Sequence, residues 1–224
     1  MSISKMTRAS EGAVFVGIDS ATVKNWYQTT HLGRLLEAQA GMYIRKAQGW
    51  SYHAPFAGHD GIQLAVGLAF RADTDFLFTY YRDLLMVLAA GMTPYEIILN
   101  GLSKDEDLAG GGRHMSNHFA KPELGIQNVS SCTGNHTLHA VGVARAIKFY
   151  GGDGVAISSQ GEASTSEGYV YEALNGASRE KLPVIFVVQN NRYGISVPVS
   201  QQSANPRVSD NYRGLKNLKI INVD

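Results

Sequence analysis

Short apolar runs alternate with helical segments through the second half of the chain, and this alternation constrains the fold more than any other feature. Buried strands are predicted at Val155–Ser159 and Val184–Gln189, and Ile126–Ser130 is also strand-like. The segments between these runs, Gly134–Tyr150 and Ser166–Arg179, are predicted to be helices. Strands that are apolar throughout, separated by helices, are typical of a parallel sheet covered on both faces. We therefore predict the α/β fold class, with a doubly wound, mostly parallel sheet.

The rest of the chain is predicted to add further helices and strands to this unit. The Thr93-Pro94 pair supplies the cap and the first position of a helix. The apolar stretches Leu84–Ala90 and Val184–Val188 are expected to lie in the core. The other predicted elements are a long helix at Thr22–Gln48, a helix at Gly61–Phe70, a strand at Asp75–Tyr80, a glycine-rich loop at Ser103–Asn117 and a closing strand at Leu218–Val223.

Composition narrows the possible classes of protein. Hydrophobic residues make up 44% of the chain and charged residues 17%, which is typical of a soluble globular protein. The net charge of +1 does not indicate nucleic acid as a partner, and no apolar stretch is long enough to span a membrane. The single cysteine, Cys132, excludes an internal disulfide and fits a reducing compartment, so we expect a cytoplasmic protein.

The length of 224 residues fits one α/β domain with a sizeable core. No internal repeat or low-complexity linker divides the chain. We therefore expect a single domain over residues 1–224, in which residues 1–50 form an N-terminal helical extension.

Polar side chains follow two of the predicted strands. Glu162 comes after the strand that ends at Ser159, and Asn191 comes after the strand that ends at Gln189. Each can be explained as turn chemistry when it is taken alone. Ligands of parallel sheets bind beyond the carboxyl ends of the strands, however, and a carboxylate, an amide oxygen and a backbone carbonyl are hard ligands suited to Mg²⁺. The helix that follows Glu162 would offer free N–H groups to phosphates.

These segments resemble the thiamine-diphosphate motif, in which Gly-Asp/Glu-Gly is followed, one strand later, by Asn-Asn. From about Leu32 to its last residue, the chain resembles the alpha subunit of the first, decarboxylating component of 2-oxo acid dehydrogenase complexes. Five motifs in family order carry the resemblance: Tyr80-Tyr81-Arg82-Asp83, Gly112-Arg113-His114-Met115, Val129-Ser130-Ser131, the segment Gly161–Gly168, and Asn190–Ser196. It implies a thiamin diphosphate-binding fold.

The resemblance also implies a set of cofactor-binding residues. Glu162 and Asn191 would bind Mg²⁺ through their side chains, and Tyr193 would bind it through its carbonyl. Tyr81 and Arg82 would contact the diphosphate, for which the planar fork of an arginine is well suited. The remaining implied contacts to thiamine diphosphate are Ser131 and Thr133 at the aminopyrimidine ring, and Gly161 with the backbone amides of Ala163 and Ser164 at the diphosphate. No catalytic residue is assigned.

Two residues and two short segments depart from the family pattern. Ala163 stands where the family has glycine, and its methyl group could crowd the phosphate or require a strained backbone. Gln189 stands where branched-chain members can have arginine and pyruvate members glutamate. The other departures are the segments Cys132–His136, beside the aminopyrimidine ring, and Gly58–Gly61.

The implied reaction is oxidative decarboxylation of a branched-chain 2-oxo acid such as 2-oxoisovalerate, with acyl transfer to a lipoyl group of a partner transacylase. A beta-type subunit or beta half would supply the glutamate that contacts the aminopyrimidine, and the protein is expected to be an oligomer. Because family alpha subunits continue past the position of Asp224, we expect a C-terminally incomplete fragment that is inactive alone. Alternatives are a pyruvate or acetoin dehydrogenase alpha subunit, or a non-catalytic scaffold or assembly subunit that has lost the cofactor.

Overall fold

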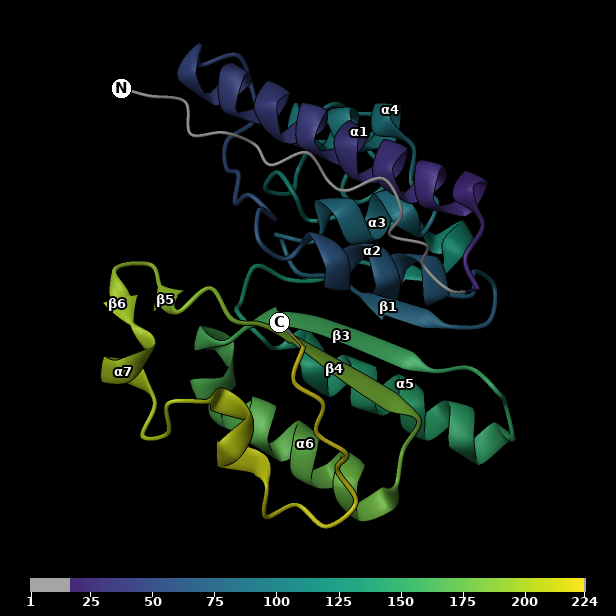
Figure 1. The fold of residues 1–224 in the computed structure, drawn as a ribbon, viewed down its shortest axis with the longest axis vertical. Helices are drawn as coiled ribbons and strands as arrows, with labels where there is room; N and C mark the ends of the chain where they lie inside the picture. The colour runs from purple at the N-terminus through teal and green to yellow at the C-terminus, as the bar shows by residue number, and fades with distance from the viewer. Residues whose placement is uncertain (1–16, 224) are drawn as a thin grey trace.

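The computed structural model describes residues 17–223, and its centre is a parallel sheet of four strands in the order β2-β1-β3-β4 (Figure 1). The predicted parallel sheet is therefore confirmed. Leu77 is in register with both Ile126 and Ile157, and Ile157 is in register with Ile185. The strands are β1 (Phe76–Phe78), β2 (Ile126–Gln127), β3 (Ala156–Gly161) and β4 (Val184–Gln189).

Helices lie on both sides of this sheet (Figure 1). One side carries α1 (Ser20–Arg45), α2 (Asp60–Ala69), α3 (Leu84–Ala89) and α4 (Pro94–Gly101), and the other carries α5 (His136–Tyr150) and α6 (Gly168–Glu180). Alternate side chains of β1 explain this layering. Leu77 packs in the core shared with α1, α3 and α4, whereas Phe78 packs in the core shared with α5.

Local sequence explains several helix positions. Asp19 caps α1 by accepting a hydrogen bond from Thr22 N at 2.9 Å. Thr93 and Glu96 form a reciprocal capping box at the start of α4. Gly67 lets α2 approach α3 closely, because a Cβ at this position would lie 2.6 Å from Ala89 Cβ. The apolar stretch that begins at Leu84 forms α3 and is buried as expected, although its helical state was not predicted.

The strand β4 corrects one expectation. Val187 and Gln189 are buried, but Ile185 is 51% exposed and Val188 is 38% exposed. In the described part of the chain β4 is an edge strand that pairs only with β3, and its exposed side chains show that its apolar run is not covered on both faces. The prediction that this stretch is a fully buried strand was therefore wrong.

The predicted closing strand at Leu218–Val223 was also wrong. This segment has no regular secondary structure. Asn217 instead ties the chain to α6 by donating from Nδ2 to Ser178 O at 2.8 Å, and Leu218 packs beside the apolar cluster of α6. Ile221 is mostly exposed. Apolar residues alone do not form a strand without a neighbouring strand that completes the hydrogen-bond ladder.

Several short elements surround the sheet and were not predicted. The predicted helix Ser166–Arg179 is divided at Glu167, whose ψ of 132° separates a 3-10 helix from α6. The short elements are η1 (Pro122–Leu124), η2 (Ala163–Ser166), β5 (Tyr193–Gly194), β6 (Val197–Pro198), α7 (Val199–Gln202) and η3 (Val208–Tyr212). Within residues 17–223, no helix is both long enough and apolar enough to cross a membrane.

Candidate cofactor site

The predicted site residues lie just beyond the carboxyl ends of the four strands. Arg82 follows β1, Ser131 follows β2, Glu162 follows β3 and Asn191 follows β4. All four strands are parallel and adjacent, so these ends share one edge of the sheet. Gly161 is paired with Gln189 in the β3–β4 register, which confirms that Glu162 and Asn191 follow adjacent strand ends.

The Glu162 carboxylate is almost fully enclosed, with 2% of the residue exposed. Its Oε2 accepts a hydrogen bond from Asn191 N at 3.3 Å, whereas Oε1 is buried and has no hydrogen-bond partner among the described residues. Burial raises the pKa of Glu162, and the Asn191 N–H and the Arg82 charge partly oppose this rise. An unpaired, buried carboxylate oxygen is costly, and a bound cation would satisfy it. The residues present therefore fit a metal ion at this position.

Asn191 and Tyr193 form a tight turn beside Glu162. Asn191 Oδ1 accepts a hydrogen bond from Tyr193 N at 2.8 Å, and Arg192 between them has a φ of 71°. The β5–β6 hairpin follows at once and pairs Tyr193 with Pro198. Across residues 17–223, no group of three or more His, Cys, Asp or Glu side chains is arranged to hold a metal ion. The predicted ligand set does not require one, because it contains one carboxylate, one amide oxygen and one carbonyl.

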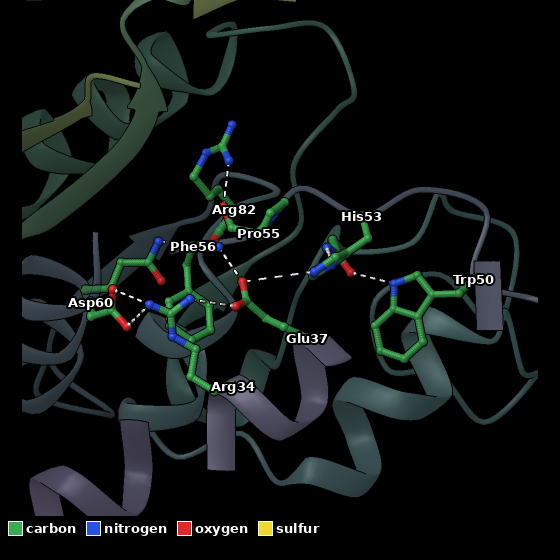
Figure 2. Close-up of polar contacts among 10 residues, drawn as sticks. Arg34, Glu37, Trp50, His53, Pro55, Phe56, Asp60 and Arg82 are labelled. Carbon is green, nitrogen blue, oxygen red and sulfur yellow. Dashed lines mark hydrogen bonds and ion pairs between the residues drawn. The ribbon is translucent and has the colours of Figure 1, made fainter. Parts of the chain in front are cut away.

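The Arg82 side chain lies beside two tyrosines at the end of β1. Its guanidinium carbon is 5.8 Å from the centre of the Tyr80 ring and 6.0 Å from that of Tyr81. Nη1 donates to Pro55 O at 2.6 Å, as Figure 2 shows. Tyr80 also explains Gly161, since a Cβ there would lie 2.7 Å from the Tyr80 hydroxyl. The structure therefore brings Tyr81, Arg82 and the end of β3 together.

Ser131 and Thr133 line a small hollow beyond the ends of β1 and β2. Ser131 Oγ lies 3.1 Å from His118 Nε2, and Thr133 O accepts a hydrogen bond from the Tyr169 hydroxyl at 2.5 Å. Burial lowers the pKa of His118, which favours the neutral form of its ring. His118 lies in the same hollow, and its contact with Ser131 could not be predicted from the sequence.

Comparison with known proteins agrees with this geometry. A family model described as "Dehydrogenase E1 component" matches residues 27–224. The chain belongs to this dehydrogenase family. It is 33% identical over 199 residues to the 2-oxoisovalerate dehydrogenase subunit alpha of Bacillus subtilis, an alignment that covers 87% of this chain and 59% of the relative.

Two further relatives have similar identity. The chain is 35% identical over 157 residues to the 3-methyl-2-oxobutanoate dehydrogenase subunit alpha of Mycobacterium tuberculosis, covering 70% of this chain and 40% of the relative. It is 36% identical over 171 residues to the pyruvate dehydrogenase E1 component subunit alpha of Bacillus cereus, covering 74% of this chain and 42% of the relative. The matches therefore span between 40% and 59% of the length of these relatives.

In this E1-family chain, a network of buried polar side chains forms hydrogen bonds with residues next to the candidate site. Asp83 is fully buried and accepts hydrogen bonds from Tyr80 N at 2.8 Å and from Gln189 Nε2. Gln63 Nε2 contacts both Gln189 Oε1 at 2.8 Å and Arg82 O at 2.9 Å. Gln189, which departs from the family pattern, thus points inward and helps to hold Asp83. Polar residues spread over such distances in sequence give no local pattern from which the network could be predicted.

Because Asp83 in this network is buried, the free energy of unfolding should depend on pH. Burial raises the pKa of Asp83 from 3.8 to about 6, so the folded state favours the protonated carboxyl. This stabilising contribution is fully present below pH 3.8 and is lost as the pH rises through about 6. We expect the free energy of unfolding, relative to an Asp83→Asn variant, to fall by on the order of 3 kcal/mol across this range. Urea titrations of both proteins from pH 3.5 to 7 measure this difference in the free energy of unfolding. A difference that does not change with pH would contradict the prediction.

Ala163 lies in an unstrained backbone, contrary to one of the expected possibilities. It begins the 3-10 helix η2 and is not among the residues with positive φ. A Cβ added to Gly194 would lie 3.0 Å from Ala163 Cβ, so the methyl group at position 163 faces the hairpin that begins at Tyr193. Because Gly194 has no side chain, it leaves room for the Ala163 methyl group.

This contact predicts a compensating pair of substitutions. Gly194→Ala should lower the free energy of unfolding by about 1 kcal/mol, because the added methyl group overpacks the contact with Ala163. Adding Ala163→Gly should restore most of this loss. Chemical denaturation of the two single variants and the double variant measures the coupling. Additive losses in the double variant would show that the two positions do not interact.

Proposed function

We propose that this chain is the alpha-type part of a thiamine-diphosphate-dependent 2-oxo acid dehydrogenase and that it binds Mg²⁺ and the cofactor at the carboxyl edge of the sheet. The observation that carries the proposal is the buried Glu162 carboxylate, whose Oε1 lacks a partner among the described residues and whose other oxygen contacts Asn191. When bound, thiamine diphosphate supplies the electron sink for decarboxylation. The protein holds the diphosphate, orients the rings and excludes water.

Each residue has a proposed part in this binding. Glu162 and Asn191 bind Mg²⁺ through side-chain oxygens, and Tyr193 binds it through its carbonyl. Arg82 grips diphosphate oxygens beside Tyr81, and the effect of its charge on Glu162, just after β3, supports this role. The other proposed contacts are Ser131 and Thr133 to the aminopyrimidine, and Gly161, Ala163 and Ser164 to the diphosphate. These roles fit a doubly wound, thiamin diphosphate-binding fold.

We propose a branched-chain 2-oxo acid, 2-oxoisovalerate or a close analogue, as the substrate. The similarity to subunits named 2-oxoisovalerate and 3-methyl-2-oxobutanoate dehydrogenase supports this choice. The similarity to a pyruvate dehydrogenase subunit keeps pyruvate as an alternative, with acetoin as another. With its partners present, the ratio of kcat/KM for 2-oxoisovalerate to that for pyruvate decides between these substrates. A ratio well above one supports the branched-chain substrate, and the reverse order contradicts it.

A beta-type subunit and a lipoyl-bearing transacylase are the proposed partners of this cytoplasmic, oligomeric enzyme. Exposed apolar side chains near the candidate site support a subunit contact there. Ile195, in the hairpin after Asn191, is fully exposed, and Tyr193 is 55% exposed. Burying such side chains is a main source of affinity in protein interfaces.

Calorimetric titration tests the cofactor proposal. Thiamine diphosphate is added to the chain in the presence of Mg²⁺ or of a chelator, and each titration is repeated with a beta-type partner. We expect binding that requires Mg²⁺ and is strengthened by the partner. Absence of binding under all four conditions would refute the enzyme assignment and favour a scaffold that has lost the cofactor.

A further inference from the structure

We propose that Glu37 is a positioning residue for Arg82, and that it acts by fixing the peptide unit between Pro55 and Phe56. This inference rests on the proposed function, because it concerns how Arg82 is held for the diphosphate. Glu37 lies on α1 and is distant from Arg82 in sequence. Figure 2 shows the two side chains on opposite sides of the Pro55–Phe56 segment.

One peptide unit connects the two side chains. The Phe56 N–H donates to Glu37 Oε1, and the Pro55 carbonyl accepts a hydrogen bond from Arg82 Nη1 at 2.6 Å. The N–H and C=O groups of a trans peptide are coplanar and point in opposite directions. When Glu37 fixes the direction of the N–H, it therefore also fixes the direction of the carbonyl that holds Arg82. Polarisation along the same peptide strengthens both hydrogen bonds.

The Glu37 carboxylate is itself held firmly. Its side chain is 10% exposed, and Oε2 accepts a hydrogen bond from Arg34 Nη1 at 3.2 Å. Arg34 also pairs with Asp60, whose Oδ2 accepts from Gly58 N at 3.0 Å, so a second backbone N–H of the segment before α2 is linked to α1. His53 Nε2 lies 4.0 Å from Glu37 Oε1, and burial lowers the pKa of this histidine.

Burial raises the pKa of Glu37, and the Phe56 N–H and Arg34 oppose this rise. If the Phe56 N–H were exposed, a water molecule could accept its hydrogen bond without fixing its direction. The buried Glu37 carboxylate accepts this hydrogen bond and also fixes the direction of the N–H. The guanidinium has five donors, so anchoring Nη1 at the Pro55 carbonyl leaves other donors for phosphate oxygens. The anchor sets the direction in which these donors point.

Double-mutant analysis of cofactor binding tests this role. Titrations of the full chain with thiamine diphosphate and Mg²⁺ compare Glu37→Ala, Glu37→Gln, Arg82→Ala and the Glu37→Ala/Arg82→Ala double variant. We expect Glu37→Ala to weaken binding by about tenfold, the size of one lost hydrogen bond. Glu37→Gln should retain most of the affinity because its amide oxygen can still accept from Phe56 N. The double variant should bind no more weakly than Arg82→Ala.

A matched control separates positioning from general destabilisation. Glu96→Ala removes another partly buried, ion-paired carboxylate, which contacts Lys121 at 2.7 Å and lies on α4. We expect it to lower the melting temperature but to leave the dissociation constant within about twofold. Equal weakening by Glu96→Ala and Glu37→Ala would overturn the positioning role, as would an additive loss in the double variant. Normal binding by Arg82→Ala would overturn the role of Arg82 in the proposed function as well, whereas normal binding by Glu37→Ala alone would overturn only this inference.

Discussion

Glu162→Ala is expected to abolish Mg²⁺-dependent binding of thiamine diphosphate. Glu162 is the one carboxylate in the predicted ligand set, and Mg²⁺ depends on hard, charged oxygen ligands. Without the Glu162 carboxylate, only an amide oxygen and a carbonyl oxygen of the proposed ligand set would remain beside the end of β4. We expect the dissociation constant, measured by calorimetric titration with saturating Mg²⁺, to rise by at least about 100-fold, because loss of only an outer-shell partner of a metal ligand already costs up to about 100-fold.

The same substitution should not unfold the protein. In the absence of metal, the buried Oε1 of Glu162 has no partner in the described residues, so its removal also removes an unfavourable group. We therefore expect an unchanged or higher melting temperature in a chelator. Glu167→Ala, which removes an exposed carboxylate at the start of α6, should leave binding unchanged. Retention of Mg²⁺-dependent binding by a folded Glu162→Ala variant would show that the metal lies elsewhere.

Turnover is expected to require a beta-type partner. In the proposed function, activation of the cofactor needs a carboxylate at the aminopyrimidine ring, and the proposed beta-type partner supplies it. The hollow beside Ser131 and Thr133 is lined, among residues 17–223, by no Asp or Glu side chain. A positioned proton-transfer group contributes roughly 10²–10⁴-fold to rate, so decarboxylation by the chain alone should be lower by at least this factor.

The measurement is decarboxylation of 2-oxoisovalerate with cofactor and Mg²⁺, with and without the partner. The partner should restore turnover with this chain and fail to do so with Glu162→Ala. Comparable turnover by the chain alone would mean that one of its own groups performs the proton transfer, and His118 would then be the first residue to replace. Its Nε2 atom lies 3.1 Å from Ser131 Oγ in the same hollow.

Local patterns in the sequence determined the parallel sheet and the part of the site that lies at its edge. The apolar runs at β3 and β4 are consecutive in sequence, and a helix between them requires a parallel crossover. Glu162 and Asn191 follow these runs directly, so their placement at adjacent strand ends did not depend on any distant contact. The Thr93 cap of α4 is equally local and was predicted for the same reason, whereas its reciprocal hydrogen bond with Glu96 is seen only in the structure.

Only the tertiary structure decided which polar side chains support the site. Gln63 meets Gln189 across 126 residues of sequence, and Glu37 reaches the Phe56 peptide from another helix. Neither contact changes a hydrophobic period or a turn signal, so neither could be predicted from the sequence. The segment Leu218–Val223 shows the converse, because its apolar residues match a strand pattern but lack a neighbour with which to pair. A strand or a buried hydrogen bond is stable only when its partner is in place, and that partner is set by the packing of the whole chain.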